Sequence, residues 1–294
     1  MVILTNGYTA NFLESMIELN PGKYPLVKKY LDQVTINNYF ARSVLEEHVN
    51  GIVYANDGDA PSTFYIVHPY KMSLLFGRTD NDSFNKAFYD YALNKTRSRN
   101  YYEWMQAWPE EWHKKLSAIF KGKTVLSKDN KNNKFPGKIE INTRVNFLLN
   151  HKKFKKISPG DKGNEFHIVR TDRELFNEMK GSVVPAFFWK NDEQFINEGV
   201  GFSLIFNNEL ASTAYAAFIH GNQLEIGIET IEKYRGKGFA QYVSSVLIDY
   251  CLKNNYEPVW SCRLENTASF RLARKLGFEP VMYVPYYRLI FRPV

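Results

Sequence analysis

The sequence has little cysteine and no long apolar run, and these absences exclude several classes of protein. The two cysteines, Cys251 and Cys262, lack flanking histidines at zinc-ligand spacing, so we expect no metal site. Two buried reduced thiols are predicted rather than a disulfide. No stretch approaches the roughly 18 consecutive apolar residues of a membrane-spanning helix. The start, Met1-Val2-Ile3-Leu4, lacks the basic region of a secretory signal. We therefore predict a cytoplasmic protein with no membrane partner.

Basic charge is distributed unevenly along the chain. The sequence has 38 Lys and Arg against 31 Asp and Glu, but residues 114–162 alone hold 14 of the former and 3 of the latter. Lysines among Asn and Gly in this segment predict a solvated loop, with a phosphate-binding surface as the alternative. Because the chain lacks a basic–aromatic stacking pattern, nucleic acid is the least favoured partner.

The first half reads as a mixture of helices and strands. With 294 residues, of which 16% are aromatic, the chain is long enough for two domains with substantial cores. Apolar positions between residues 11 and 48 recur at helical spacing. Three tryptophans four residues apart, which predict one face of a short helix, are Trp104, Trp108 and Trp112. The segments that predict strands are 51–55, 62–67, 72–77 and 139–145, with a helix after Asp82 and a loop over 121–138.

The second half has clearer signals. Ser158-Pro159-Gly160-Asp161 is a strong turn, so we predict domains at 1–158 and 159–294. Asp172 is expected to cap a helix. The remaining predicted strands are 166–169, 201–206, 210–220, 224–230, 258–262 and 281–291, and the remaining helices are 238–253 and 266–276.

One loop carries the features of an anion site. The predicted strand 224–230 leads into Arg235-Gly236-Lys237-Gly238, and a helix follows. Gly236 and Gly238 permit a close backbone approach to a ligand, and the N-terminus of the helix adds partial positive charge. Arg235 and Lys237 bring formal charges, which suit a pyrophosphate.

Two linked motifs resemble the GNAT superfamily of acetyl-CoA-dependent N-acyltransferases. The superfamily's phosphate loop reads Arg/Gln-x-x-Gly-x-Gly/Ala, and residues 235–240 (Arg-Gly-Lys-Gly-Phe-Ala) match it. Its second signature is a helix ending Leu-Gly-Phe, matched by Leu276-Gly277-Phe278, with Asn266 at the signature's first position. Surrounding residues, including Trp189 and Trp260, resemble the branch that includes zwittermicin A resistance proteins.

The resemblance implies a fold, a co-substrate and its binding residues. We expect an α+β (mixed α/β) fold, with a central twisted and mostly antiparallel sheet in the second half. Acetyl-CoA is the implied co-substrate. The residues that would bind it are Ile228, Glu229 and Thr230 through the pantetheine arm, Arg235, Gly236, Lys237, Gly238, Phe239 and Ala240 through the pyrophosphate, and Asn266 near the thioester.

Direct acyl transfer to an amine requires a base, and the departing thiolate requires an acid. Glu225 stands where some GNAT members have a glutamate base, and Glu229 shares its face by the period of two. The alternative is that both are solvent-facing carboxylates. Ala273 replaces the tyrosine that acts as acid in many members, so Tyr283 is the candidate acid. Asn266 is a candidate for orienting cofactor or water, or the N-cap of the last helix.

The sequence therefore predicts an N-acetyltransferase that acts on the amine of a small molecule, a metabolite or an antibiotic-like compound. The alternative is a non-catalytic acyl-CoA-binding or regulatory protein, which the loss of the tyrosine at Ala273 would permit. A homodimer is compatible with the sequence. The order of predicted elements in the first half repeats that of the second, so we expect a tandem architecture. In it, residues 1–158 form a smaller, degenerate GNAT-like unit that does not bind the co-substrate.

Overall fold

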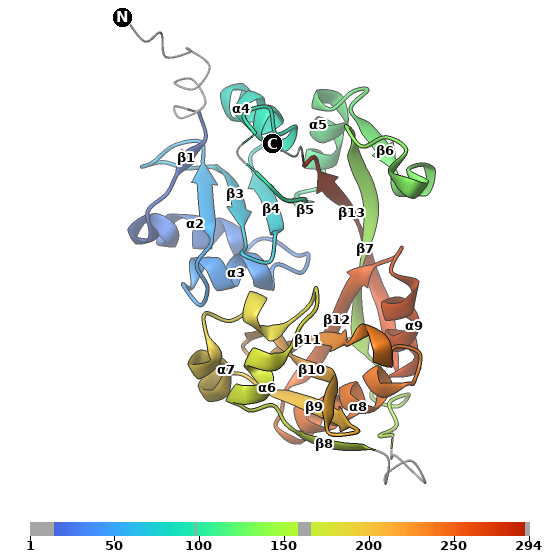
Figure 1. Ribbon diagram of the computed structural model, residues 1–294. Coiled ribbons are helices and arrows are strands. Elements are labelled where there is room, and N and C mark those ends of the chain that lie inside the picture. The colour runs from blue at the N-terminus through green and yellow to red at the C-terminus, as the bar shows by residue number, and fades with distance from the viewer. Residues whose placement is uncertain (1–14, 98, 158–165, 292–294) are drawn as a thin grey trace, which may run out of the picture. The chain divides into compact units, whose positions relative to one another are not determined.

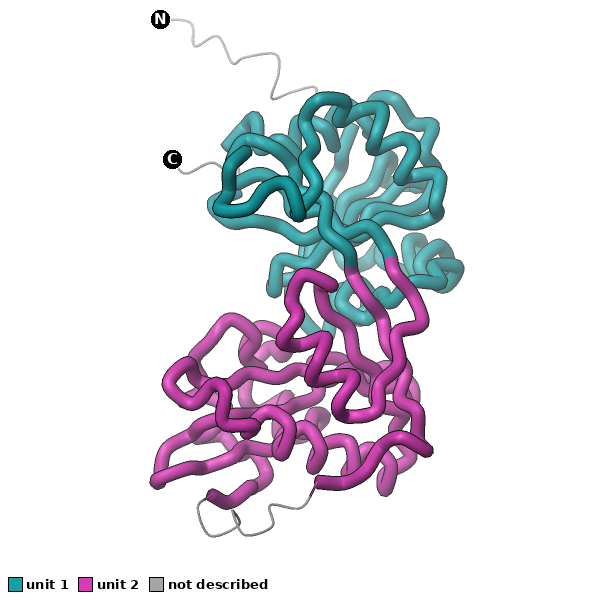
Figure 2. Tube along the Cα trace, turned by 90° about the vertical axis from the view of Figure 1, so that its right-hand side faces the viewer, with its two compact units in different colours: residues 1–143, 284–294 teal, residues 144–283 magenta. Residues whose placement is uncertain are grey.

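The computed structural model describes residues 15–97, 99–157 and 166–291. The chain forms two compact units: unit 1 comprises residues 1–143 and 284–294, and unit 2 comprises residues 144–283 (Figure 2). The chain passes between the units within two long strands, β7 (Ile139–Leu149) and β13 (Phe278–Leu289). The turn at which the sequence places the domain boundary, residues 158–161, lies outside the described residues.

Unit 1 is a mixed sheet with helices, in the strand order β1-β2-β3-β4-β5-β13 (Figure 1). Its strands are β1 (Ile17–Glu18), β2 (Ile52–Ala55), β3 (Thr63–Val67), β4 (Met72–Gly77) and β5 (Glu103–Trp108). Its helices are α2 (Tyr24–Leu31), α3 (Tyr39–Leu45), α4 (Asp82–Ala92) and α5 (Glu111–Ile119). The segment after α5 contains β6 (Thr124–Leu126), which pairs with the start of β7. The predicted strands in the first half and the helix after Asp82 are thus confirmed.

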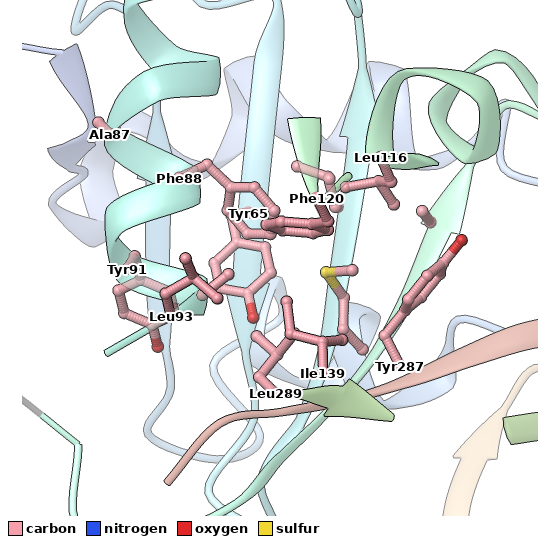
Figure 3. Close-up of a cluster of buried hydrophobic side chains, with 14 of the residues drawn as sticks. Tyr65, Ala87, Phe88, Tyr91, Leu93, Leu116, Phe120, Ile139, Tyr287 and Leu289 are labelled. Carbon is pink, nitrogen blue, oxygen red and sulfur yellow. The ribbon is translucent and has the colours of Figure 1, made fainter. Parts of the chain in front are cut away.

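Aromatic side chains fill the core of unit 1. Helix α4 turns Phe84, Phe88 and Tyr91 to one face because they follow the spacing i, i+4 and i+7. Tyr65 of β3 packs edge-on against Phe88, and Phe120 after α5 tilts against it (Figure 3). Burying each such side chain stabilises the fold by about 1.5–3 kcal/mol.

The helix predicted from the three tryptophans is wrong. Trp104 and Trp108 lie in strand β5, and Trp112 lies in α5. Residues four apart share a face both in a helix and in a strand, so this spacing cannot separate the two. The parallel pairing of β5 with β4 decides for the strand.

Unit 2 contains the better-predicted elements, in the strand order β7-β12-β11-β10-β9-β8. Its remaining strands are β8 (Phe166–Arg170), β9 (Gly201–Phe206), β10 (Glu209–His220), β11 (Gln223–Thr230) and β12 (Glu257–Arg263). Its helices are α6 (Arg173–Glu178), α7 (Asp192–Glu198), α8 (Phe239–Lys253) and α9 (Thr267–Lys275). Only the β11–β12 pair in this order is parallel, so the expected mixed α/β fold with a mostly antiparallel sheet is confirmed.

Two strands, β7 and β13, each begin in one unit and end in the other. Strand β7 follows α5 of unit 1, yet its second half pairs with β12 of unit 2. Strand β13 follows α9 of unit 2, yet its last residues pair with β5 of unit 1. The strand order of each unit therefore ends in a strand that continues from the last α-helix of the other unit. Across the described ranges, every helix falls short of the length and apolarity that a membrane-spanning helix needs.

Candidate active site

The central feature of unit 2 is a parting of two parallel strands. Strands β11 and β12 pair from Gln223↔Glu257 to Glu225↔Val259. Beyond that point β11 continues to Thr230 on its pairing with β10, and β12 continues to Arg263 on its pairing with β7. The backbone of residues 226–230 therefore has hydrogen-bonding groups directed to the β12 side that the pairing with β12 does not satisfy. Thr230 N donates to the Glu229 carboxylate and Thr230 O accepts from Arg235 Nε, so an extended ligand can pair with the groups that remain.

The loop between β11 and α8 has the backbone conformation that its glycines permit. Gly236 and Gly238 have φ angles of 80° and 84°, in the left-handed region that other residues avoid. Among the described residues, and leaving aside the adjacent backbone, no atom lies within 4 Å of a Cβ built on Gly236. For Gly238 a Tyr242 ring carbon lies at 3.9 Å. The glycines thus face open space.

The N-terminus of α8 adds to this site. Gly238 occupies the N-cap position and supplies no side-chain cap. Because the first N–H groups of a helix have no intrahelical acceptor, they remain available to an anion. Lys237 lies over the ring of Phe206, 5.6 Å from its centroid, and Arg235 is largely exposed. Two cationic residues, two glycines that face open space and a helix N-terminus therefore belong to one short loop.

Glu225 lies at the point where β11 and β12 part. Its side chain is 7% exposed and forms a buried ion pair with Arg144 of β7, 3.2 Å between Nη2 and Oε1. Ser261 of β12 donates a hydrogen bond to the same carboxylate. The Arg144 guanidinium also donates to Ser261 Oγ, at 2.5 Å. The three adjacent strands β7, β12 and β11 are thus joined by a polar triad of two buried charged side chains and the half-buried Ser261.

Glu229 is the second carboxylate on this face of β11. It is 6% exposed, so the alternative that Glu225 and Glu229 are solvent-facing is wrong for both. Between them, the ring of Tyr215 covers Gly227, where a Cβ would lie 2.5 Å from the ring. Glu229 accepts hydrogen bonds from the segment before α7 and from Arg235 of the glycine loop.

Asn266 and Ala273 belong to helix α9. The side chain of Asn266 accepts a hydrogen bond from Ser269 N at 3.2 Å, so Asn266 caps the helix as the sequence predicts. Ala273 is fully buried, and its methyl group carries no proton to donate. Nothing at position 273 therefore replaces the missing tyrosine.

The tyrosines of β13 have different surroundings. Tyr283 is 54% exposed, so its hydroxyl is accessible. Tyr286 stacks on Trp104, and Tyr287 lies 3.1 Å from His113 Nδ1. Burial raises the pKa of Tyr287 to about 12, which makes it a poor proton donor at neutral pH. Tyr283 is the more accessible of these hydroxyls.

The cysteines are inert by their surroundings. Both are reduced and buried, as predicted. Burial raises the pKa of Cys251 to about 12 and also raises the pKa of Cys262. Since the thiolate is the nucleophilic form, neither cysteine suits covalent catalysis.

The structure brings together residues that the sequence analysis did not connect. Arg144 lies on a predicted strand, but nothing in the local pattern identifies its partner 81 residues later. Ser182 lies in no motif, and Ser261 belongs to the segment Trp260-Ser261-Cys262 of the branch resemblance, which assigns it no role. Alternation along 139–145 places Arg144 on one face of a strand, and this is the only local signal for its role.

Comparison with known proteins identifies relatives over nearly the whole chain. A family model described as GNAT acetyltransferase matches residues 29–287. A Bacillus subtilis (strain 168) protein named uncharacterized N-acetyltransferase YdfB is 28% identical over 273 residues, which cover 92% of this chain and 97% of the relative.

Two solved structures share the fold. A GCN5-related N-acetyltransferase-like protein from Streptococcus suis has a TM-score of 0.63 at 18% identity, covering 91% of this chain and 98% of its own. A tandem GNAT protein from the clavulanic acid biosynthesis pathway has a TM-score of 0.57 at 10% identity, covering 95% and 99%. At these identities the likeness concerns the fold and not the substrate.

Proposed function

The chain belongs to the GNAT acetyltransferase family, and we propose that it transfers the acetyl group of acetyl-CoA to the amine of a small molecule by direct attack. The observation that carries the proposal is the parting of β11 and β12 directly before the glycine loop. An extended arm can pair with the free side of one strand while its pyrophosphate reaches the loop.

The residues of unit 2 suit acetyl-CoA at each point of its length. Residues 236–240 offer backbone N–H groups to the pyrophosphate, and Arg235 and Lys237 add positive charge. The backbone of Ile228–Thr230 pairs with the pantetheine arm. Acetyl-CoA supplies an activated acetyl group, and the protein holds it where an amine can reach it.

Glu225 is the proposed base. It lies at the end of the paired stretch of β11, where the pantetheine arm would stop. Arg144 and Ser261 fix the orientation of its carboxylate. The proton of the attacking amine passes to Glu225, directly or through water.

Tyr283 and Asn266 complete the proposal. The exposed hydroxyl of Tyr283 protonates the departing thiolate. Asn266 orients the thioester or a water while it caps α9. The acceptor is a metabolite or an antibiotic-like amine, as the resemblance to the zwittermicin A resistance branch suggests.

A specific observation favours a second candidate, a non-catalytic acyl-CoA-binding protein. Ala273 leaves the usual acid position without a proton donor, and Glu225 is already in a buried ion pair. A proton on Glu225 would leave Arg144 without this counter-ion, which is costly for a buried charge. Such a protein would bind acetyl-CoA and release no thiol.

Two measurements separate the candidates. Isothermal titration with acetyl-CoA tests the binding that both candidates share. A thiol-release assay with acetyl-CoA over a panel of primary amines then tests transfer. Release of CoA with an amine, and formation of the acetylated amine by mass spectrometry, supports the enzyme. Binding without release across the panel supports the second candidate, and absence of binding contradicts both.

A further inference from the structure

The buried carboxylate of Glu229 accepts five hydrogen bonds from two different segments of the chain. Its Oε2 accepts from the backbone N–H groups of Ser182 and Val183, both at 2.9 Å, and from Ser182 Oγ at 3.3 Å. Its Oε1 accepts from Thr230 N at 3.2 Å and from Arg235 Nη2 at 3.3 Å. Each oxygen therefore serves a different segment.

The contact with the segment before α7 is close. Gly181 has a φ of 155°, and a Cβ built on it would lie 2.6 Å from carboxyl atoms of Glu229. A side chain at residue 181 would collide with the carboxylate. Only a glycine lets the backbone of residues 181–183 lie against Glu229 in this way.

The contact with the glycine loop fixes Arg235. Its Nε donates to the backbone oxygen of Thr230 at 3.1 Å while its Nη2 donates to Glu229. The side chain of Arg235 is nonetheless 60% exposed. An exposed arginine ordinarily samples many rotamers, and ordering it costs conformational entropy. The two acceptors at the end of β11 order the guanidinium before any ligand arrives.

We propose that Glu229 is a positioning residue for the co-substrate: it orders Arg235 for the pyrophosphate with one oxygen and holds residues 182–183 beside β11 with the other. This inference rests on the proposed binding of acetyl-CoA. It assigns Glu229 no proton transfer, because a carboxylate has about four lone-pair positions and five donors already share them. The side chain acts in addition to the backbone pairing proposed for residue 229.

The glutamine variant separates the contact of Glu229 with Arg235 from its contact with residues 182–183. In Glu229→Gln the amide oxygen can still accept from Ser182 and Val183, but the NH₂ group then faces the donors of Arg235 and Thr230. Arg235 is released while residues 182–183 stay in place. In Glu229→Ala both contacts are lost. Glu232→Gln is the matched control, since Glu232 is an exposed carboxylate beside the same loop.

The test compares acetyl-CoA with acetyl-pantetheine, a thioester that lacks the pyrophosphate. We expect Glu229→Gln to raise KM for acetyl-CoA about tenfold, the loss of one charge-assisted contact, with kcat nearly unchanged. The kcat/KM for acetyl-pantetheine should fall by a much smaller factor, because that thioester has no pyrophosphate for Arg235 to contact. Glu229→Ala should lower kcat/KM for both thioesters. Arg235→Met removes the cation itself, so it should raise KM for acetyl-CoA at least as much as Glu229→Gln does, and adding Glu229→Gln to it should raise KM no further.

The outcomes are distinct from those that test the proposed function. An equal loss with both thioesters in Glu229→Gln, or an unchanged KM for acetyl-CoA, overturns the positioning role. If the wild-type protein binds CoA but turns over neither thioester, the transferase fails, and the dissociation constants of CoA for wild type, Glu229→Gln and Arg235→Met still test the role of Glu229. If the wild-type protein does not bind CoA, both proposals are overturned.

Discussion

The two units have a similar order of helices and strands, but they differ in how far a pair of parallel neighbouring strands stays hydrogen-bonded. In unit 1, β4 and β5 remain paired from Met72↔Trp104 to Phe76↔Trp108. In unit 2, β11 and β12 part after Glu225↔Val259. A closed pair satisfies its own backbone groups, whereas a parted pair leaves them for a ligand. We therefore propose that the sheet of unit 2 binds the co-substrate and that the sheet of unit 1 does not.

The loops that follow β4 and β11 also differ, in the capping of the next helix and in the space beside their glycines. In unit 1 the side chain of Asn81 caps α4 by accepting from Phe84 N. Arg78 N bonds to Ser62 O, which would also lie 2.2 Å from a Cβ on Gly77. In unit 2 the N-terminus of α8 has no side-chain cap, and Gly236 faces open space. We therefore propose that unit 1 is a degenerate GNAT-like unit without a co-substrate.

The largest effect is expected from removing strand β7. A fragment of residues 159–294 lacks β7, so β12 loses its partner along residues 259–263 and Glu225 loses Arg144. Breaking a buried ion pair on one side costs about 3–5 kcal/mol, and an edge of the sheet is exposed as well. We expect no cooperative unfolding transition and no binding of acetyl-CoA.

A fragment that begins at residue 139 restores β7 and is the matched comparison. It should recover at least part of the binding measured by calorimetry. Binding by the 159–294 fragment as tight as that of the full chain would show that β7 is dispensable.

The next effect concerns the open loop. Replacing Gly238 by Val forces a β-branched residue to a φ of 84°, at about 1–2 kcal/mol or more, and fills the space proposed for the phosphates. Calorimetry should detect no binding of acetyl-CoA. Gly122→Val is the control, because Gly122 of unit 1 has a φ of 73° and open space around its Cβ position.

The same titrations test the comparison itself. The control variant and the wild type should bind one acetyl-CoA per chain. Two per chain would contradict the degenerate character of unit 1, and unchanged affinity in Gly238→Val would contradict the assignment of the loop.

The third effect is on turnover. Glu225→Gln should lower kcat by roughly 10²–10⁴-fold if Glu225 is the base, with the dissociation constant of acetyl-CoA nearly unchanged. The loss of rate toward acidic pH should disappear with it. The measurement is a pH profile of kcat and kcat/KM.

The ion pair with Arg144 requires a control for stability. Replacing one partner leaves a buried charge, whereas replacing both removes the penalty. The double variant Arg144→Met, Glu225→Gln should therefore unfold closer to wild type than the single variant, and its turnover should stay low. If turnover recovers with stability, Glu225 is structural and the base lies elsewhere.

Local sequence patterns predicted most helices and strands of unit 2, but they did not predict the side-chain contacts between residues far apart in the chain. The hairpin of β9 and β10 turns at Asn207 and Asn208, both with positive φ, and asparagine tolerates that conformation. The glycines at 236 and 238 likewise predicted a loop whose backbone can adopt positive φ angles, as it does. Arg144 could not be matched to Glu225, because their contact depends on β7 crossing from the preceding half of the chain, which no local pattern encodes. The contacts of Glu229 with residues 182–183 could not be predicted either, because Glu229 and these residues are more than 40 positions apart in the sequence.

The smallest effect concerns Glu103, a buried glutamate of unit 1 whose surroundings contrast with those of Glu225 in unit 2. Glu103 of β5 is fully buried and forms no ion pair within the described part of the chain; the Tyr65 and Tyr91 hydroxyls donate to its oxygens. Burial raises the pKa of Glu103 well above its ordinary value. The folded protein thus holds a proton that the unfolded chain releases. This stabilisation is complete below the unfolded pKa and is lost by about 1.4 kcal/mol per pH unit as pH rises toward the folded pKa.

Glu103→Gln should remove this pH dependence, because an amide keeps partners for both tyrosines and does not titrate. The urea midpoint of the variant should rise relative to wild type between about pH 5 and pH 8. Glu110→Gln, at an exposed glutamate of the same unit, should follow the wild-type curve. Parallel curves for Glu103→Gln and wild type would mean that Glu103 is charged when folded. Unit 1 would then stabilise a buried carboxylate with hydroxyl groups alone, where unit 2 uses an arginine.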